Sequence, residues 1–339
     1  MPTEHASAEG GRAAVLAGLG AWLPPRVVDN EEISRTLDTS DEWIRTRTGI
    51  HERHVVDPGT STVDLATEAG SRALRSAGFD RVDALVLATA TPDQVCPGSA
   101  PQVASRLGLG GIAAFDVNAV CSGFVYALAT AAGLIASGVA QRILVIGADA
   151  FTTLVDPEDR GTVPIFGDGA GAVVLRAGTS EEPGALGPFD LHSDGELADL
   201  LMVRAGGARQ RHSENPADYF LDMRGTAVFR HAAARMAECS RAVLDQAGWT
   251  VADVDRFVGH QANIRILNAV AKQLGLPLDS LVVNIERTGN TSAASIPLAF
   301  ADAVADGSLK AGDRVLVSAF GAGLTWGATL LRWPDVALA

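Results

Sequence analysis

The chain has 339 residues, 47% of them hydrophobic and 20% charged, which is typical of a folded globular protein and excludes the disordered and fibrous classes. At about 150 residues per domain, this length predicts about two domains. The formal net charge is −13, and we expect no nucleic-acid partner, because a protein that coats nucleic acid would carry the opposite sign.

The N-terminal sequence MPTEHASAEGGRAA has no charged segment followed by an apolar one. We therefore expect no signal peptide, and we expect residues 1–11 to form a mobile tail. From residue 12 onward, short apolar strands alternate with helical patterns, which predicts an α/β fold.

A stretch of 25 uncharged residues lies between Asp116 and Arg142, and this is long enough to span a bilayer. Much of it is Ala, Gly, Ser and Thr, which contribute little transfer energy but allow a helix to pack closely between two layers. We therefore expect a buried central helix and no membrane partner. A transmembrane helix is the alternative.

An internal repeat divides the chain. Residues 74–87 and 244–258 each end an amphipathic helix at Ala-Gly-aromatic and lead through an acidic linker into an apolar strand, at an offset of 170 residues. Each half then has a Ser- and Gly-rich helix start, a second apolar strand and a Gly-rich turn. The repeat predicts two similar α/β halves, 12–180 and 223–339, joined by an irregular connection at 181–222.

Cys121 is a candidate nucleophile. It follows a short strand, 114–118, and opens the uncharged helix, where the helix dipole would lower the pKa of its thiol. The alternative for any cysteine is a small buried apolar residue, and we keep that interpretation for Cys96 and Cys239 at this point. The three cysteines have no CxxC spacing, which predicts neither a disulfide framework nor a metal site and fits a reducing cytoplasm.

His260 and Asn290 are candidate partners of Cys121. His260 follows an apolar strand, 256–258, at the carboxyl end where α/β sheets bind ligands. The repeat places Asn290 at the start of the second central helix, where Cys121 stands in the first half. Although a lone His is more often structural, a thiol, an imidazole and an amide facing one cavity form a constellation for acyl transfer.

The sequence resembles the 3-oxoacyl-acyl-carrier-protein synthase III family of the thiolase superfamily, over about residues 13–333. The matching motifs are DTSDEWIRTRTGI (38–50), DVNAVCSGF (116–124), DRGTVPIFGDGAGAVVL (159–175), GHQANIRI (259–266), GNTSAAS (289–295) and FGAGLTWG (320–327). The resemblance implies a thiolase-like αβαβα layered fold made of two duplicated halves, with the nucleophile in the first half and the His and Asn in the second.

The resemblance also implies catalytic roles. Cys121 would take an acyl group from an acyl-CoA. His260 and Asn290 would bind the malonyl thioester carbonyl and stabilise the enolate formed on decarboxylation. The backbone N–H of Cys121 and that of the loop containing Ala322 and Gly323 would form an oxyanion hole.

Two sets of binding residues follow from the same resemblance. The expected CoA-binding residues are Trp43, Arg47, Arg160, Gly225, Phe229 and Asn263. The expected contacts with an acyl-carrier protein are Arg224, Arg230, Arg265 and Lys272. Charge supports the second set, because residues 204–230 and 256–272 are locally basic in an acidic chain. A solvated loop and helix face is the alternative.

Cys96 departs from the family pattern. The bacterial housekeeping members carry a bulky aromatic residue before Pro97, and it closes the acyl pocket of the partner subunit. A cysteine there predicts a deeper pocket for longer or branched acyl groups. The resemblance also implies a homodimer.

The predicted function is therefore the decarboxylating condensation of an acyl-CoA with malonyl-acyl-carrier protein, giving 3-oxoacyl-carrier protein, CoA and CO₂, at the start of fatty-acid or polyketide chains. A polyketide-priming synthase or a non-condensing acyltransferase of secondary metabolism is the alternative. A thiolase would need a second catalytic cysteine near the C-terminus, and none follows Cys239. A non-catalytic scaffold is disfavoured by the three polar residues, Cys121, His260 and Asn290.

We expect CoA thioesters as substrates and no cofactor, because GDGAGAVVL (167–175) precedes a strand and is a weak match to a dinucleotide motif.

Overall fold

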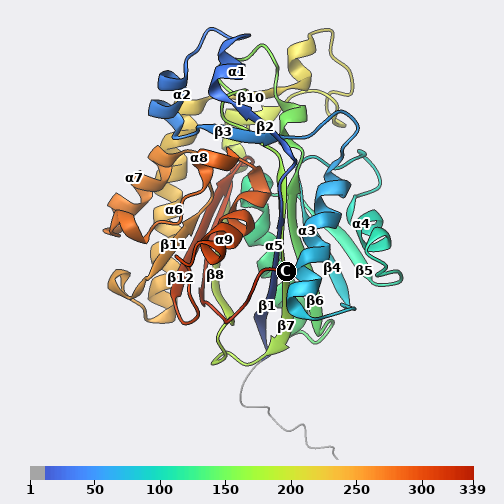
Figure 1. Ribbon diagram of the computed structural model, residues 1–339, viewed down its shortest axis with the longest axis vertical. Coiled ribbons are helices and arrows are strands. Elements are labelled where there is room, and N and C mark those ends of the chain that lie inside the picture. The colour runs from blue at the N-terminus through green and yellow to red at the C-terminus, as the bar shows by residue number, and fades with distance from the viewer. Residues whose placement is uncertain (1–11) are drawn as a thin grey trace, which may run out of the picture.

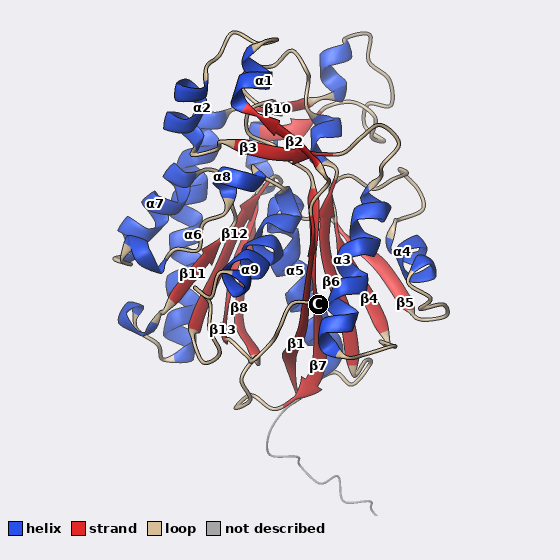
Figure 2. Ribbon diagram, in the orientation of Figure 1, coloured by secondary structure: helices blue, strands red, loops and turns tan. Residues whose placement is uncertain are grey.

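The computed structural model describes residues 12–339, and the predicted tail at residues 1–11 lies outside this range. Two twisted sheets stand side by side, with helices between them and on both outer faces (Figure 1 and Figure 2).

The first sheet contains strands from the N-terminal part of the chain, in the order β1-β7-β6-β4-β5. Its strands are β1 (Ala13–Trp22), β4 (Ala84–Ala88), β5 (Ala113–Val117), β6 (Arg142–Asp149) and β7 (Gly169–Gly178). β4 runs parallel to β5 and β6, whereas β7 is antiparallel to β1 and β6. The central strands are short and continuously apolar because helices cover both of their faces.

The second sheet has the order β11-β12-β13-β8. Its strands are β8 (Leu186–Ser193), β11 (Arg256–Gly259), β12 (Arg314–Gly321) and β13 (Thr325–Arg332). β8 falls inside the segment 181–222 that we expected to be a connection, yet it pairs with β13 as the edge strand of this sheet. The second sheet therefore begins before the boundary predicted at residue 223.

Six helices build the helical layers. They are α3 (Thr62–Ala77), α4 (Ala100–Arg106), α5 (Gly123–Ala136), α6 (Gly225–Ala247), α7 (Ile264–Leu274) and α9 (Ser295–Ala305). α3 and α4 pack on the outer face of the first sheet, α6 and α7 on that of the second, and α5 and α9 lie between the sheets (Figure 1). This arrangement confirms the predicted αβαβα layering.

The uncharged segment before Arg142 forms α5, whose Phe124, Val125 and Leu128 are buried between the two sheets. Of the helices within residues 12–339, none is long and apolar enough to cross a membrane. The expectation of a buried central helix is confirmed.

Smaller elements gather at the end of the molecule to which the parallel strands point (Figure 1). They are β2 (Arg26–Asp29), α1 (Asn30–Ser34), α2 (Asp41–Thr48), β3 (Glu52–Val55), β9 (Leu201–Val203), β10 (Leu221–Met223) and α8 (Ile285–Thr288). In α/β proteins this edge binds ligands, so these elements are placed to enclose a site.

The duplication extends to the turns that begin the two central helices. Asn118 Oδ1 accepts a hydrogen bond from the N–H of Val120, and Asn290 Oδ1 accepts one from the N–H of Ser292. Val120 and Ser292 both have a left-handed backbone, with φ of 46° and 51°. The structural counterpart of Asn290 is therefore Asn118. The prediction that Asn290 occupies the place of Cys121 was wrong by three residues.

Candidate active site

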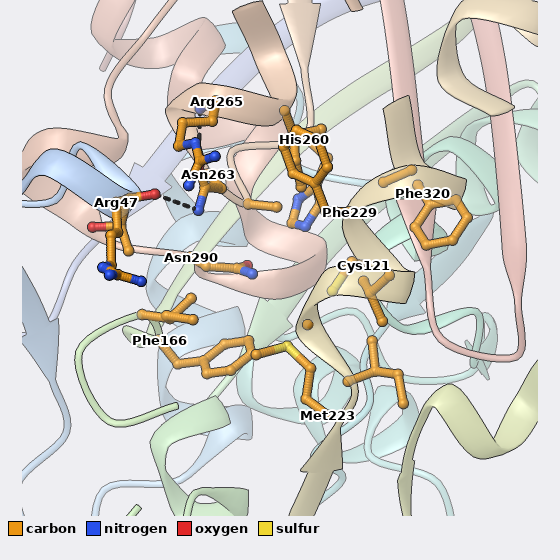
Figure 3. A pocket seen from close by; sticks show the side chains of 18 of the residues that line it. Arg47, Cys121, Phe166, Met223, Phe229, His260, Asn263, Arg265, Asn290 and Phe320 are labelled. Carbon is orange, nitrogen blue, oxygen red and sulfur yellow. Dashed lines mark hydrogen bonds between the residues drawn. The ribbon is translucent and has the colours of Figure 1, made fainter. Parts of the chain in front are cut away.

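A cavity of about 400 Å³ opens between the smaller elements at this end of the molecule and the starts of the two central helices, and it brings Cys121, His260 and Asn290 together (Figure 3). Predicted binding residues also line it: Trp43, Arg47, Gly225, Phe229, Arg230, Asn263 and Arg265. The structure thus joins residues from both halves around one space.

Cys121 lies in a 3₁₀ turn, Val120–Ser122, immediately before α5, and it is 5% exposed. Burial raises the pKa of its thiol to about 12. The predicted lowering of this pKa by the helix dipole was therefore wrong, because enclosure of the sulfur disfavours the thiolate more than nearby hydrogen-bond donors favour it. At neutral pH the free enzyme holds Cys121 as a thiol.

His260 follows β11 and is 2% exposed. Its Nδ1 lies 2.6 Å from the hydroxyl oxygen of Ser295, the first residue of α9. Burial lowers the pKa of the imidazole to about 3, so the ring is neutral at physiological pH. When the Ser295 hydroxyl donates to Nδ1, the proton of the neutral ring is on Nε2.

Asn290 is held by the first half of the chain. Its N–H donates to the carbonyl of Ile165 at 2.8 Å, and its carbonyl accepts from the N–H of Gly167 at 3.0 Å. Since its side-chain Oδ1 is used by the N–H of Ser292 at 2.9 Å, its Nδ2 remains as a donor on the cavity side. Figure 3 shows this amide in the same space as Cys121 and His260.

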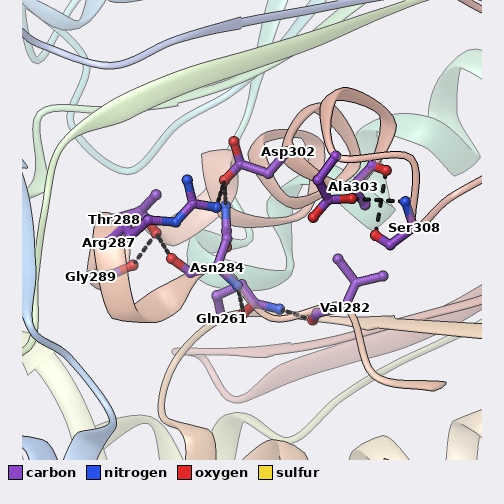
Figure 4. A network of polar contacts seen from close by, with 10 residues as sticks. Gln261, Val282, Asn284, Arg287, Thr288, Gly289, Asp302, Ala303 and Ser308 are labelled. Atoms are coloured by element: carbon purple, nitrogen blue, oxygen red, sulfur yellow. Dashed lines mark hydrogen bonds and ion pairs between the residues drawn. The ribbon is translucent and has the colours of Figure 1, made fainter. Parts of the chain in front are cut away.

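A buried polar network fixes the segment that leads to Asn290 (Figure 4). The amide nitrogen of Gln261, next to His260, donates to the carbonyl of Val282 at 3.1 Å. Its oxygen accepts from the N–H of Asn284 at 3.2 Å. Asn284 in turn donates to Asp302 of α9 at 2.8 Å, so one network connects the His260 strand, the Asn290 segment and a central helix.

The loop after β12 packs against the Cys121 turn. The hydroxyls of Thr325 and Ser122 are hydrogen-bonded at 2.7 Å, and Thr325 also bonds the Ala119 carbonyl at 3.1 Å. A Cβ added at Gly321 would lie 2.9 Å from the nitrogen of Cys121, so the chain needs a glycine there. The predicted oxyanion loop at Ala322 and Gly323 is thereby held beside the nucleophile. The hole itself stays a prediction.

The mouth of the cavity carries an aromatic ring with two cations close to it. The guanidinium carbon of Arg47 lies 4.6 Å from the centre of the Trp43 ring, and that of Arg160 lies 5.1 Å from it. Arg160 also pairs with exposed Asp38 at 3.1 Å. Asn263 donates to the Arg47 carbonyl at 3.0 Å and so fixes the edge of the mouth.

The wall between this mouth and Cys121 is apolar, and sequence reasoning missed most of it. The residues that form it include Phe151, Phe166, Leu201, Met223, Val228 and Phe320. Sequence reasoning also assigned no role to Ser295, although it lies in the motif 289–295. The position of Ser295, a hydroxyl-bearing residue at the start of a buried helix, could have indicated a role in the site.

Asp149 is a second polar group that the sequence reasoning missed. It ends β6, is fully buried, and accepts hydrogen bonds from Thr89 and Thr91 and from the N–H of Ala293 at 3.1 Å. Burial raises the pKa of its carboxyl. An acid directly after an apolar strand run was the available signal.

Six predicted site residues lie outside the cavity lining, and two of them, Ala322 and Gly323, belong to the loop after β12. Arg160 lies at its rim, against Trp43. Arg224 caps α6 and pairs with Asp199 at 3.3 Å, and Lys272 is exposed in the last turn of α7. Cys96 is exposed in the loop before α4. Across residues 12–339, no group of three or more His, Cys, Asp or Glu side chains could hold a metal ion.

Family models match both halves of the chain. The model described as 3-Oxoacyl-[acyl-carrier-protein (ACP)] synthase III matches residues 115–195, and the model of its C-terminal part matches residues 244–333. The two matches contain Cys121, His260 and Asn290.

Similar proteins extend over nearly the whole chain. Beta-ketoacyl-[acyl-carrier-protein] synthase III 5 of Streptomyces coelicolor is 58% identical, covering 96% of this chain and 98% of its own. The crystal structure of 3-oxoacyl-(acyl carrier protein) synthase III from Pseudomonas aeruginosa is 50% identical, with a TM-score of 0.91 and coverage of 96% and 99%. The priming beta-ketosynthase of the R1128 polyketide pathway is 36% identical, with a TM-score of 0.90 and coverage of 97% and 98%.

Fold and site together define a condensing enzyme of the acyltransferase class, built on the thiolase fold. The relatives make the assignment specific. The chain belongs to the 3-oxoacyl-[acyl-carrier-protein] synthase III family.

Proposed function

We propose that this enzyme condenses an acyl-CoA with malonyl-acyl-carrier protein, releasing CoA and CO₂ and leaving a 3-oxoacyl-carrier protein. The observation that carries the proposal is the convergence of Cys121, His260 and Asn290 on one cavity with an aromatic and cationic mouth. The relatives named above support the same chemistry.

The first step is transfer of the acyl group to Cys121. The sulfur attacks the thioester carbonyl, a new carbon–sulfur bond forms, and the bond to CoA breaks. The thiol proton leaves with CoA as its own thiol. Because the pKa of Cys121 is about 12, proton loss accompanies the attack rather than preceding it. Backbone N–H groups of Cys121 and of the Ala322–Gly323 loop would stabilise the oxyanion.

The second step uses His260 and Asn290. A malonyl thioester that enters the same space places its carbonyl oxygen against His260 Nε2–H and Asn290 Nδ2–H. The bond between the carboxylate and the α-carbon breaks, CO₂ leaves, and the two donors stabilise the enolate. The α-carbon then attacks the acyl carbonyl, a carbon–carbon bond forms, and the Cys121 sulfur leaves. Both donors are neutral, so neither forms an ion pair with the malonyl carboxylate that would oppose its loss as CO₂.

The mouth would bind the nucleotide end of CoA. Trp43 offers a face for an adenine ring, and Arg47 and Arg160 offer positive charge for phosphates. The pantetheine arm would then pass Gly225, Phe229 and Asn263 to reach Cys121. Arg224, Arg230, Arg265 and Lys272 would meet the acidic surface of a carrier protein.

The proposal also covers cofactor use, cellular compartment and oligomeric state. The enzyme uses CoA thioesters as substrates and no cofactor. It acts in a reducing cytoplasm, which suits its free thiols. It is a homodimer. The dimer is supported by the edge strand β5, which has β4 as its neighbour within the described sheet and leaves Phe115 37% exposed.

Priming of a polyketide chain is the second candidate role. The likeness to a priming ketosynthase of a polyketide pathway favours it, and the two roles share every step above. Supplying fatty-acid and polyketide carrier proteins in parallel assays separates them, because one carrier should support condensation and the other should not.

Mass spectrometry tests the first step. Incubation with an acyl-CoA should add the acyl mass to the peptide carrying Cys121. Cys121→Ala should abolish the adduct, whereas His260→Ala and Asn290→Ala should retain the adduct and lose CO₂ release. A wild-type enzyme that forms no adduct contradicts the proposal. Equal loss of acylation in all three variants contradicts the division of roles.

A separate variant tests the acyl pocket. Cys96→Phe should restrict the enzyme to short acyl-CoAs, because the larger side chain would fill space in the partner's pocket across the dimer. We expect about tenfold lower kcat/KM for long or branched acyl-CoAs and little change for acetyl-CoA. Matching chain-length profiles for wild type and variant would show that Cys96 is no gate.

A further inference from the structure

Ser292 has a backbone conformation that side-chain-bearing residues rarely adopt. Its φ of 51° lies in the left-handed region, which is strained for a residue other than glycine. The turn is held by Asn290 Oδ1, which accepts from the Ser292 N–H at 2.9 Å, and by Asp149 Oδ2, which accepts from the Ala293 N–H at 3.1 Å. These two hydrogen bonds hold the strained turn, and the turn fixes the position of the Ser292 side chain.

The Ser292 hydroxyl is fully buried, in a turn that packs on the Cys121 turn and whose next residue, Ala293, donates its N–H to Asp149. It makes no hydrogen bond of good geometry within the described part of the chain. It nevertheless lies close enough to the Cys121 thiol and the Asp149 carboxyl to lower the pKa of each. The 3₁₀ turn that contains Ser292 packs directly against the turn that contains Cys121.

One hydroxyl proton cannot serve two acceptors at once. While Cys121 is a thiol or a thioester, its sulfur needs no donor, and the hydroxyl can turn to Asp149. When the sulfur leaves at the end of condensation it carries negative charge in a buried site, where a donor has its greatest effect.

We propose that Ser292 is a hydrogen-bond donor to the Cys121 thiolate, held between this sulfur and Asp149 so that it can turn to the sulfur when charge develops there. This role rests on the proposed function of Cys121 as the acyl acceptor. It adds a fourth side chain, on the protein side of the sulfur, to the three that face the cavity.

The test measures the reactivity of Cys121 without any substrate. Wild type is alkylated with iodoacetamide from about pH 7 to about pH 9, and the modified Cys121 peptide is quantified by mass spectrometry, which separates it from Cys96 and Cys239. Asp149 and His260 are the titratable groups that face this sulfur, and both are retained in every variant. Because the range from about pH 7 to about pH 9 lies well below the thiol pKa of about 12, the alkylation rate is proportional to the small thiolate fraction, and the ratio of the rates of two proteins reports the difference in their thiol pKa.

Two variants remove the hydroxyl in different ways. Ser292→Ala keeps the Cβ and its backbone strain, whereas Ser292→Gly relieves the strain. Both should be alkylated about tenfold more slowly than wild type at every pH, which corresponds to a thiol pKa about one unit higher. Thr291→Val is the matched control, because Thr291 is an adjacent, fully buried residue whose hydroxyl bonds no group within residues 12–339.

Wild-type rates in both Ser292 variants would overturn the proposal, as would an equal slowing in Thr291→Val. Slower alkylation in Ser292→Ala but not in Ser292→Gly would assign the effect to backbone strain and would also overturn the proposal. Alkylation needs neither acyl-CoA nor carrier protein, so this test does not depend on the proposed function. Failure of the proposed function would instead appear as a missing acyl adduct after incubation with acyl-CoA.

Discussion

At the scale of single residues, the site depends on groups kept neutral by burial. The thiol pKa of Cys121 is raised to about 12 and the imidazole pKa of His260 is lowered to about 3, in both cases because removal from water disfavours the charged form. A charged His260 would attract the malonyl carboxylate and oppose its loss as CO₂. A neutral ring that only donates suits decarboxylation better.

The neutrality of His260 has a measurable effect on stability. The unfolded chain protonates this ring below about pH 6.5, whereas the folded chain resists protonation down to about pH 3. Between these values the unfolded state binds more protons, so the free energy of unfolding decreases as the pH falls, by up to about 1.4 kcal/mol per pH unit. Above about pH 6.5 the contribution of this ring is fully present.

Urea unfolding of wild type and His260→Gln at pH values between about 7 and about 5 measures this effect. Other titrating groups contribute equally to both proteins, so the difference in slope isolates His260. Wild type should lose more stability than the variant as the pH falls. Parallel curves would mean that His260 is protonated in the folded chain.

At the scale of elements, short segments position the catalytic side chains. Gly289 has a φ of 65° and immediately precedes Asn290, and a Cβ there would lie 3.0 Å from Cβ of Arg53 and 3.1 Å from the carbonyl oxygen of Ile165. Ile165 also accepts the N–H of Asn290. Asn290 is therefore positioned both by the Gly289 turn and by its backbone hydrogen bond to Ile165 in the first half.

Gly289→Ala should displace Asn290 and spare Cys121. We expect CO₂ release to fall about tenfold or more, because a misplaced donor loses transition-state stabilisation, while acylation of Cys121 continues. Gly78→Ala is the control, since Gly78 has a φ of 67° and open space around its Cβ position. Both variants place an alanine at a positive φ and are destabilised by that backbone strain. Comparable CO₂ release in the two would contradict this positioning role.

The predictability of an element from sequence depended on its burial. Gly78 and Gly248 end two helices with nearly equal φ, and their Ala-Gly-aromatic signature exposed the repeat. β8 was missed because LGPFDLHS has no clear alternation, and an edge strand tolerates Pro and charge. Cys121 and His260 were predictable because each stands between a strand and a helix, and Asn290 because the repeat places it before the second central helix. The apolar cavity wall was not, because spacing cannot distinguish a wall residue from a core residue.

At the scale of the whole molecule, the two halves meet at closely packed backbone. A Cβ at Gly147 of β6 would lie 2.4 Å from the carbonyl oxygen of Ala293, at the base of α9. This contact joins the first sheet to the turn that holds Asn290 and Ser292. The interface is therefore part of the active-site scaffold.

A pair of glycine variants tests the fit of the halves. Gly147→Ala should lower the free energy of unfolding by about 1–3 kcal/mol, because a rigid carbonyl blocks the added methyl group. Gly133→Ala, on exposed α5 surface with no atom within 4 Å of the Cβ position, should be neutral or stabilising by about 0.5–1 kcal/mol. Urea unfolding measures both, and equal stabilities would show that the halves are not tightly fitted here.

The matching turns at the two central helices have a consequence for stoichiometry. Ala293 is the counterpart of Cys121, but its N–H already donates to Asp149, whereas Gly321, the counterpart of Asp149, has no side chain to occupy the N–H of Cys121. Two copies of one backbone thus contain a single turn that is open to an acyl oxygen. Saturation with acyl-CoA should therefore load one acyl group per chain, and two per homodimer.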